Sequence, residues 1–295
     1  MTVDLVAASR FLTTHARLLD RHRGLQLLGD GNPQAVLSAL AAYRNPDGGY
    51  GWGLEPDLRA PESQPAGALH AFEVLDEAGP VTSPAAVGLC DWLDSVSLPD
   101  GGLAFALPLA DAAGCAPFWA NADSSVSSLH ITSAVTASAL RVARHDKGVA
   151  VHPWLARATE YCLDRVAAVD GPVHAIELKF VLEFLDVLSE QRPDVLPQLE
   201  RLGGAIPPTG LLHVDGGLED EMMRPLDFAP LPDRPVRALF TAPVIAAELD
   251  RLEAQQEQDG GWQTDFAAAS PAAALEWRGY RTVWAMSVLR HNGRV

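Results

Sequence analysis

A short turn sequence recurs along this chain and restricts the folds that the chain can adopt. In its first copy, Asn45-Pro46-Asp47-Gly48-Gly49-Tyr50, two glycines follow an aspartate. Related turns, one of them without its second glycine, lie at Asp100, Asp170, Asp215 and Asp259. Successive aspartates are 53, 70, 45 and 44 residues apart, which leaves room for a pair of helices in each interval. Self-similarity at a roughly constant spacing is typical of repeat architectures.

The stretch before each turn has the signals of a helix. Proline stands at or near the start of most of these stretches, where its missing N–H costs nothing, and the glycines supply the left-handed conformation that ends a helix. We therefore predict a set of outer, amphipathic helices. These are Pro33 to Tyr43, Pro84 to Val96, Pro153 to Ala168, Pro193 to Leu202 and Thr241 to Gln256.

A second, more apolar stretch follows most of the turns. Small and apolar residues lie on most of its sides, which predicts a helix that is buried on most sides. The predicted inner helices are Gln64 to Ala78, Ser125 to Ala143, Val173 to Leu188 and Ala274 to Leu289. After the fourth turn, residues 218–240 are rich in acids, Pro and Met, and we expect a long irregular loop in place of an inner helix.

These patterns predict an all-α protein in which residues 1–295 form a single domain. Almost no segment shows the alternation of β-branched residues that is typical of strands. We expect about five helical hairpins that close into an α/α toroid, a barrel with an inner ring of helices inside an outer ring.

The charge balance restricts the partners of the chain. Lys and Arg number 22 and Asp and Glu 38, so the net charge is −16. This disfavours nucleic acid, whose phosphates need clustered basic residues. No run of about 18 apolar residues is uninterrupted, so we expect no stable membrane insertion. The early acid Asp4 and the scattered cysteines predict a cytoplasmic protein without a cleaved signal peptide. The oligomeric state stays open.

The last copy of the turn resembles a known repeat. Gln255-Gln256-Glu257-Gln258-Asp259-Gly260-Gly261-Trp262 is similar to the Q-x-x-D-G-G-W turn of the squalene-cyclase and protein-prenyltransferase repeat family, and Asn45 to Tyr50 is the next best match. The resemblance implies a divergent, terpenoid-cyclase-like toroid that holds its ligand in a central hydrophobic cavity. It also implies a structural role for the turn, with Gln255 or Gln258 and Trp262 joining neighbouring helices.

Several motifs of that superfamily are missing from this chain. It has no D-x-D-D run for the proton donor of class II terpene cyclases, and no Asp-x-Cys pair for the zinc of protein prenyltransferases. It also lacks the Cys-His pair of lanthionine synthetases. We therefore expect neither a metal nor another cofactor. Because the same toroid carries many carbohydrate-active enzymes, the resemblance specifies the scaffold better than the chemistry.

The candidate site residues lie just before the predicted inner helices or in their first turns. The predicted proton donors are Glu55 and Asp57, in the loop after the first turn, and Glu276, at the start of the last inner helix. Aromatic faces nearby would stabilise positive charge on a ligand. The candidate substrate-binding residues are Trp52, Arg59, Gln64, Phe118, Trp119, Asp123, His130, Trp277, Arg278 and Tyr280.

Structural interpretations compete with these functional ones. Arg59 could bridge Asp57 or Glu62 within its loop, and Asp123 could cap a helix. His130 could be a proton shuttle that faces inward, or a hydrogen-bonded core residue. The pattern alone leaves both interpretations open.

The leading functional hypothesis is a protein that binds a hydrophobic, isoprenoid-like or polycyclic small molecule and cyclises or isomerises it by acid catalysis. Such a protein would be an isomerase or a lyase that works without the D-x-D-D motif. The alternative is a non-catalytic toroid that binds a hydrophobic ligand or a partner. A second alternative is a carbohydrate-active α/α-barrel enzyme, which would need paired carboxylates across an open cleft.

Overall fold

A computed structural model of the chain describes residues 3–80 and 83–295. The described residues form 14 α-helices and are 57% helical, which confirms the all-α prediction. The strands of the described part are β1 (Leu212–His213) and β2 (Met222–Met223), which pair antiparallel. Within the same ranges, no helix has both the length and the apolar character needed to cross a membrane.

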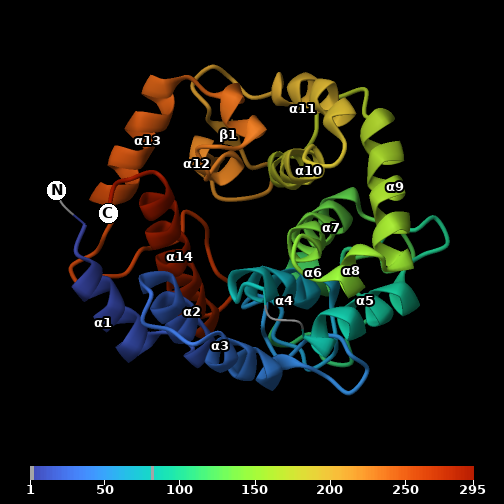
Figure 1. Cartoon of the computed structure of the whole chain (residues 1–295), viewed down its shortest axis with the longest axis horizontal. Helices are drawn as coiled ribbons and strands as arrows, with labels where there is room; N and C mark the ends of the chain where they lie inside the picture. Colours follow the sequence, from blue (N-terminus) through green and yellow to red (C-terminus); the bar gives the residue numbers. More distant parts are fainter. Residues whose placement is uncertain (1–2, 81–82) are drawn as a thin grey trace.

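One set of helices lies along the periphery of the molecule (Figure 1). The five predicted outer helices are confirmed here, with ends that shift by a few residues. In two of them part of the helix is 3₁₀: η1 (Ala41–Tyr43) extends α3, and η2 (Pro193–Val195) leads into α11. The peripheral helices are α1 (Leu5–His15), α3 (Pro33–Leu40), α5 (Pro84–Val96), α9 (Pro153–Ala167), α11 (Leu196–Gly203) and α13 (Ala242–Ala254).

A second set lies inside the first (Figure 1). Its members pack on one another in chain order: α4 on α7, α7 on α10, and α10 on α12, while α14 packs on α2. The four predicted inner helices are confirmed as α4, α7, α10 and α14. The inner helices are α2 (Leu18–Leu28), α4 (Pro65–Glu77), α7 (Leu129–Ala143), α10 (Ala175–Leu188), α12 (Pro225–Phe228) and α14 (Pro271–His291). Two further short helices are α6 (Pro117–Ala120) and α8 (Lys147–Ala150).

The first and last helices of the described chain, α1 and α14, pack against each other (Figure 1). The Asp4 backbone N–H donates to Gln256 Oε1, and Gln256 Nε2 donates to the Asp4 carbonyl, both at 2.8 Å. Trp262 joins α13 to α14, because its ring N–H donates to the Leu252 carbonyl and its backbone N–H donates to Thr282 Oγ1. The prediction for Trp262 is thus confirmed. The glutamine that links distant segments is Gln256, rather than Gln255 or Gln258.

Three of the five repeated aspartates hold their own turns and tie them to the following inner helix. Asp47 Oδ1 accepts the Gly49 N–H at 2.9 Å and the Ser63 hydroxyl at 2.8 Å, directly before α4. Gly48, with φ of +97°, adopts the left-handed conformation that was predicted for this turn. The same pattern recurs where Asp100 accepts from Gly102 and Ser127, and where Asp259 accepts from Gly261 and Arg278.

The second glycine of the turn is required by close packing, which gives a testable prediction. A Cβ atom on Gly49 would lie 2.5 Å from Ser63 Cβ and 2.6 Å from the Trp92 ring. We expect Gly49→Ala to lower the free energy of unfolding by about 2–3 kcal/mol, measured by urea denaturation. Gly171→Ala is the matched control, since nothing lies within 4 Å of its Cβ position. Equal stability of the two variants would contradict this account of the turn.

Two parts of the fold differ from the sequence prediction. Helices α1 and α2 were not predicted, because no Asp-Gly-Gly turn follows them; α2 ends instead at Gly29, with φ of +88°. Residues 218–240 were predicted to be one irregular loop, but β2, α12 and the 3₁₀ segment η3 (Pro235–Leu239) lie within them. No long inner helix forms in this segment of the described chain, although Leu226 and Phe228 are buried.

Candidate functional site

The loop after the first turn and the helices α4 and α14 bring several predicted site residues together. Glu55 and Asp57 lie in the loop, and Trp277 and Tyr280 lie on α14. Glu55, Trp277 and Tyr280 contact His70 of α4, a residue that was not predicted as part of the site, and Asp57 joins them through the Trp277 ring N–H. We call these five residues, together with Glu73 of α4, the His70 cluster.

His70 lies between two carboxylates. Its Nε2 is 2.8 Å from Glu55 Oε2, and its Nδ1 is 2.9 Å from Glu73 Oε2. Only the imidazolium form can donate from both nitrogens at once. Burial alone would lower the pKa of His70, but Glu73 and Glu55 raise it from 6.5 to about 9. His70 is therefore positively charged at neutral pH.

Glu73 is the centre of the hydrogen bonds in this cluster. In addition to His70, the Tyr280 hydroxyl donates to both of its carboxylate oxygens, at 3.1 and 3.2 Å. Burial alone would raise the pKa of Glu73, but His70 lowers it to about 2. Burial raises the pKa of Tyr280 well above its usual value, so its hydroxyl stays protonated and donates. The Glu73 side chain is 19% exposed, so it lies at the edge of the cluster.

Asp57 connects the loop to the region of α14. Its Oδ1 accepts the Ala269 backbone N–H at 2.7 Å, and its Oδ2 accepts the Trp277 ring N–H at 2.8 Å. The residue is 5% exposed, and burial raises the pKa of its carboxyl group above the usual value. This raised pKa of Asp57 is in the direction that an acid catalyst needs.

The other two predicted acids are held by cations. Glu55 contacts the His70 imidazolium, and Glu276 Oε2 lies 2.6 Å from Arg59 Nη1. A carboxylate in such a pair acts as a counter-ion, and its geometry supports an orienting role better than proton donation. Arg59 therefore pairs with Glu276 of α14, rather than with Asp57 or Glu62 in its own loop.

A set of ion pairs on α2 borders the His70 cluster. Arg23 Nε lies 2.7 Å from Glu77 Oε2, and its Nη1 lies 3.1 Å from Asp20 Oδ1. Arg17 Nε lies 2.7 Å from the other oxygen of the fully buried Asp20. The Arg23 guanidinium is also 5.0 Å from the centroid of the Tyr280 ring. These pairs join α2 to α4 and offset part of the negative charge of the neighbouring carboxylates.

Three of the predicted binding residues form a separate aromatic cluster. Trp119 stacks on Phe105 with ring centroids 4.4 Å apart, and Phe118 lies beside Trp119. His130 contacts Phe105 at 5.2 Å and stacks on Phe180 at 5.1 Å. Burial lowers the pKa of His130 to about 3, so its ring is neutral at physiological pH. This supports the core interpretation of His130 over a proton shuttle near neutral pH.

Gln64 joins the loop before α4 to the loop around Leu107, whereas Asp123 stabilises its own loop. The Gln64 amide exchanges hydrogen bonds with the backbone of Leu107, accepting at 2.8 Å and donating at 3.2 Å. Asp123 Oδ1 accepts the backbone N–H and the hydroxyl of Ser125. Asp123 therefore stabilises a turn and does not cap a helix as the structural interpretation expected, because the N-cap of α7 is Ser128.

The side chains of Trp52 and Arg278 each donate a hydrogen bond to a residue of a repeated turn. Trp52 is 59% exposed, adopts a left-handed φ of +57°, and donates its ring N–H to Asn45 Oδ1. Arg278 donates to Asp259 of the last turn at 2.9 Å. Of the predicted binding residues, Trp277 and Tyr280 are thus the ones that contact His70, and Arg59 reaches α14 through Glu276.

His70 and Glu73 are the main site residues that the sequence analysis missed. They stand three residues apart on a predicted inner helix, so they share a face, and Glu77 follows four residues later. Ionisable residues on a helix that is otherwise apolar and buried could have identified this site from the sequence, because buried charges are rare unless they are paired.

In the described part of the chain, no group of three or more His, Cys, Asp or Glu side chains is arranged to hold a metal ion. No protein-family model matches the chain, and a comparison with curated proteins gives no significant match. The geometry of the His70 cluster is therefore the basis for a functional proposal.

The paired charges of the cluster predict a pH dependence of stability. The folded pKa of His70 is raised from 6.5 to about 9, so its stabilisation is complete below pH 6.5 and is lost as the pH rises through 9. We expect the free energy of unfolding to fall by about 2–3 kcal/mol more in the wild type than in His70→Gln over this range. Urea denaturation at a series of pH values measures the free energy of unfolding of the wild type and of His70→Gln. Parallel pH profiles for the two proteins would contradict the ion pairing of His70.

Proposed function

We propose that the protein is a terpenoid-cyclase-like α/α toroid whose inner helices bind a hydrophobic small molecule and cyclise or isomerise it by acid catalysis. The order in which the inner helices pack, together with the contact between the first and last helices, supports a closed ring. The observation that carries the functional part is the ionised Glu73 carboxylate, which is bonded to His70 and to the Tyr280 hydroxyl, with the Trp277 ring packed against Tyr280.

This arrangement suits a molecule on which positive charge develops. The Trp277 and Tyr280 rings meet edge to face, with centroids 5.4 Å apart, and His70 and Tyr280 hold the Glu73 carboxylate in place. Aromatic faces and a fixed carboxylate both stabilise a cation, and a preorganised group needs no rearrangement when the charge appears. The ligand class is then an isoprenoid-like or polycyclic molecule that reacts through a carbocation.

In this proposal Asp57 supplies the proton. Its O–H bond breaks, a C–H bond forms at one carbon of a substrate double bond, and the positive charge moves to the other carbon. Loss of a proton from a neighbouring carbon to the Asp57 carboxylate completes an isomerisation or cyclisation, and the acid is regenerated. The raised pKa of Asp57 favours the protonated starting form.

One observation favours the non-catalytic alternative. Both oxygens of Asp57 already accept N–H donors, from Ala269 and Trp277, so protonation of either oxygen would disturb a hydrogen bond. If Asp57 stays ionised, the cluster would bind a hydrophobic ligand that already carries a positive charge, without converting it.

The catalytic proposal is tested by incubating the purified protein with geranyl, farnesyl and geranylgeranyl diphosphates and with squalene at acidic, neutral and alkaline pH. Gas chromatography with mass spectrometry measures the substrate consumed and the products formed. We expect an isomerised or cyclised product from at least one substrate. If none of them is consumed at any pH, the catalytic proposal is wrong, and the binding alternative is preferred.

A further inference from the structure

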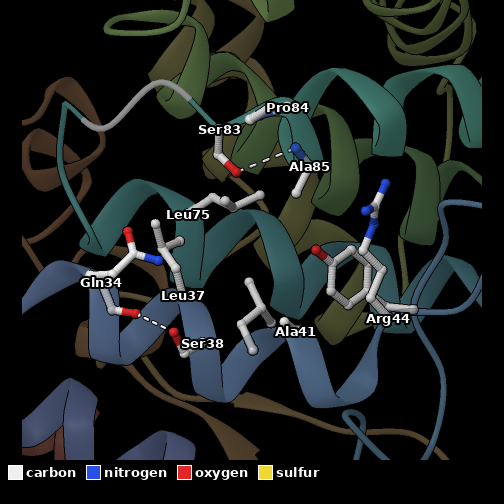
Figure 2. A pocket seen from close by; sticks show the side chains of 11 residues that line it. Gln34, Leu37, Ser38, Ala41, Arg44, Leu75, Ser83, Pro84 and Ala85 are labelled. Carbon is white, nitrogen blue, oxygen red and sulfur yellow. Dashed lines mark hydrogen bonds between the residues drawn. The ribbon is translucent and has the colours of Figure 1, made fainter.

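A pocket of about 310 Å³ lies between α3, α4 and α5, and no residue of the His70 cluster lines it. Figure 2 shows Leu37 and Leu75 on opposite helices facing the same space, with Ser83 and Ala85 at the start of α5 along another side. Leu40 adds to the apolar wall. The pocket therefore combines a volume suited to a small molecule with a wall of leucines and several polar side chains.

The charge at this pocket has one sign. Arg44 lines it, and no Asp or Glu does. Throughout residues 3–80 and 83–295, no carboxylate lies within ion-pair distance of the Arg44 guanidinium, although the chain has a net charge of −16. Arg44 is exposed to solvent and free to pair with an anion that enters the pocket, and its planar donors match a carboxylate in particular.

Tyr50 supplies a second donor. Its side chain is 1% exposed and lines the pocket, and its hydroxyl forms no hydrogen bond with any described residue. Burial raises the pKa of Tyr50 to about 12, so the hydroxyl keeps its proton. Because no described residue accepts a hydrogen bond from this hydroxyl, it is available to a ligand in the pocket. Of the two serines that line the pocket, Ser38 donates to the Gln34 carbonyl, and Ser83 Oγ accepts the Ala85 N–H (Figure 2).

Comparison of two copies of the turn shows that the polar atom of Tyr50 differs from its counterpart in its hydrogen bonding. Arg44 and Tyr50 face each other in an antiparallel bridge on the two sides of the first turn. In the last copy of the turn, the residue that corresponds to Tyr50 is Trp262, whose ring N–H donates to the Leu252 carbonyl of the preceding helix at 2.8 Å. The polar atom at this position is thus satisfied by protein in one copy and left without a protein partner in the other.

We propose that the pocket between α3, α4 and α5 binds a small carboxylate with an apolar body. Arg44 pairs with the carboxylate, the Tyr50 hydroxyl donates a hydrogen bond to it, and the body of the ligand lies against Leu37, Leu40 and Leu75. This site is separate from the His70 cluster and takes a ligand of the opposite charge.

Isothermal titration calorimetry of the full chain with 2-naphthoate, and with octanoate as a second carboxylate, tests the proposal. We expect saturable binding of at least one carboxylate, and about tenfold weaker binding of the matching neutral amide. Arg44→Gln should remove the preference for the carboxylate. Arg165→Gln is the control, because it removes the same charge from an exposed position on α9, outside the pocket.

Tyr50→Phe separates binding from folding. Since the hydroxyl has no protein partner among the described residues, we expect this variant to unfold at the same or a higher urea concentration and yet to bind the carboxylate several-fold more weakly. The proposal is overturned if neither carboxylate binds saturably at millimolar concentration, if the acid and its amide bind equally, or if Arg44→Gln binds like the wild type.

Discussion

We expect His70→Ala to lower the free energy of unfolding at neutral pH by about 3–5 kcal/mol. The substitution removes the cation between Glu55 and Glu73 and leaves two carboxylates next to each other in a largely buried site. Like charges that have lost their shared partner repel each other and cannot be fully rehydrated. Urea denaturation monitored by circular dichroism measures the loss.

His291→Ala is the control for this experiment. His291 is exposed at the end of α14 and bonds only to Ser287 among the described residues, so its removal should change stability by less than about 0.5 kcal/mol. The deficit of His70→Ala should also shrink at acidic pH, where the stranded carboxylates become protonated. If the deficit is small at neutral pH, or does not change with pH, His70 is not the counter-ion of the cluster.

The second large effect is expected from Asp57→Asn. If Asp57 donates the proton, the amide should reduce turnover by about 100-fold or more, because it has no acidic proton at the pH of the assay. Glu276→Gln is the matched control: it removes a carboxylate from the same region, but one that is paired with Arg59 at the edge of the site. We expect that variant to keep turnover within about tenfold of the wild type.

The structural cost of Asp57→Asn must be measured alongside its turnover. The new amide N–H₂ would face either the Ala269 or the Trp277 N–H, and the lost hydrogen bond should cost about 1–3 kcal/mol. Rates are therefore compared per folded molecule, with the folded fraction taken from circular dichroism. Equal rates for Asp57→Asn and the wild type would exclude Asp57 as the acid, and a larger loss in Glu276→Gln would transfer that role to Glu276.

The helices could be predicted where local chemistry marks their ends. α5 was predicted from Pro84 to Val96 and has those bounds, because Ser83 caps it, proline begins it and the Pro-Asp-Gly-Gly turn follows shortly after it. α2 has neither a side-chain cap nor a proline at its start, and the turn motif that defines the repeat does not follow it. It was missed for that reason.

The candidate site was predictable only in part, because its contacts join distant segments. Asp57 and the Trp277 ring N–H are 220 residues apart in the chain, and no local pattern gives that distance. The acids and aromatics could be nominated by their position before inner helices. The pairing of Glu55 with His70, and of Glu276 with Arg59, depends on how α4 and α14 approach each other, and this pairing distinguishes a proton donor from a counter-ion.

The most direct test of the central claim is the affinity of the His70 cluster for a cation on a hydrophobic body. Isothermal titration calorimetry compares N,N-dimethylgeranylamine, which is protonated at neutral pH, with the uncharged geranyl methyl ether of similar shape. We expect the amine to bind about tenfold more tightly than the ether, and this preference to disappear in Glu73→Gln. If the amine and the ether bind equally, or if Glu73→Gln keeps the full preference, the His70 cluster does not stabilise positive charge on a ligand.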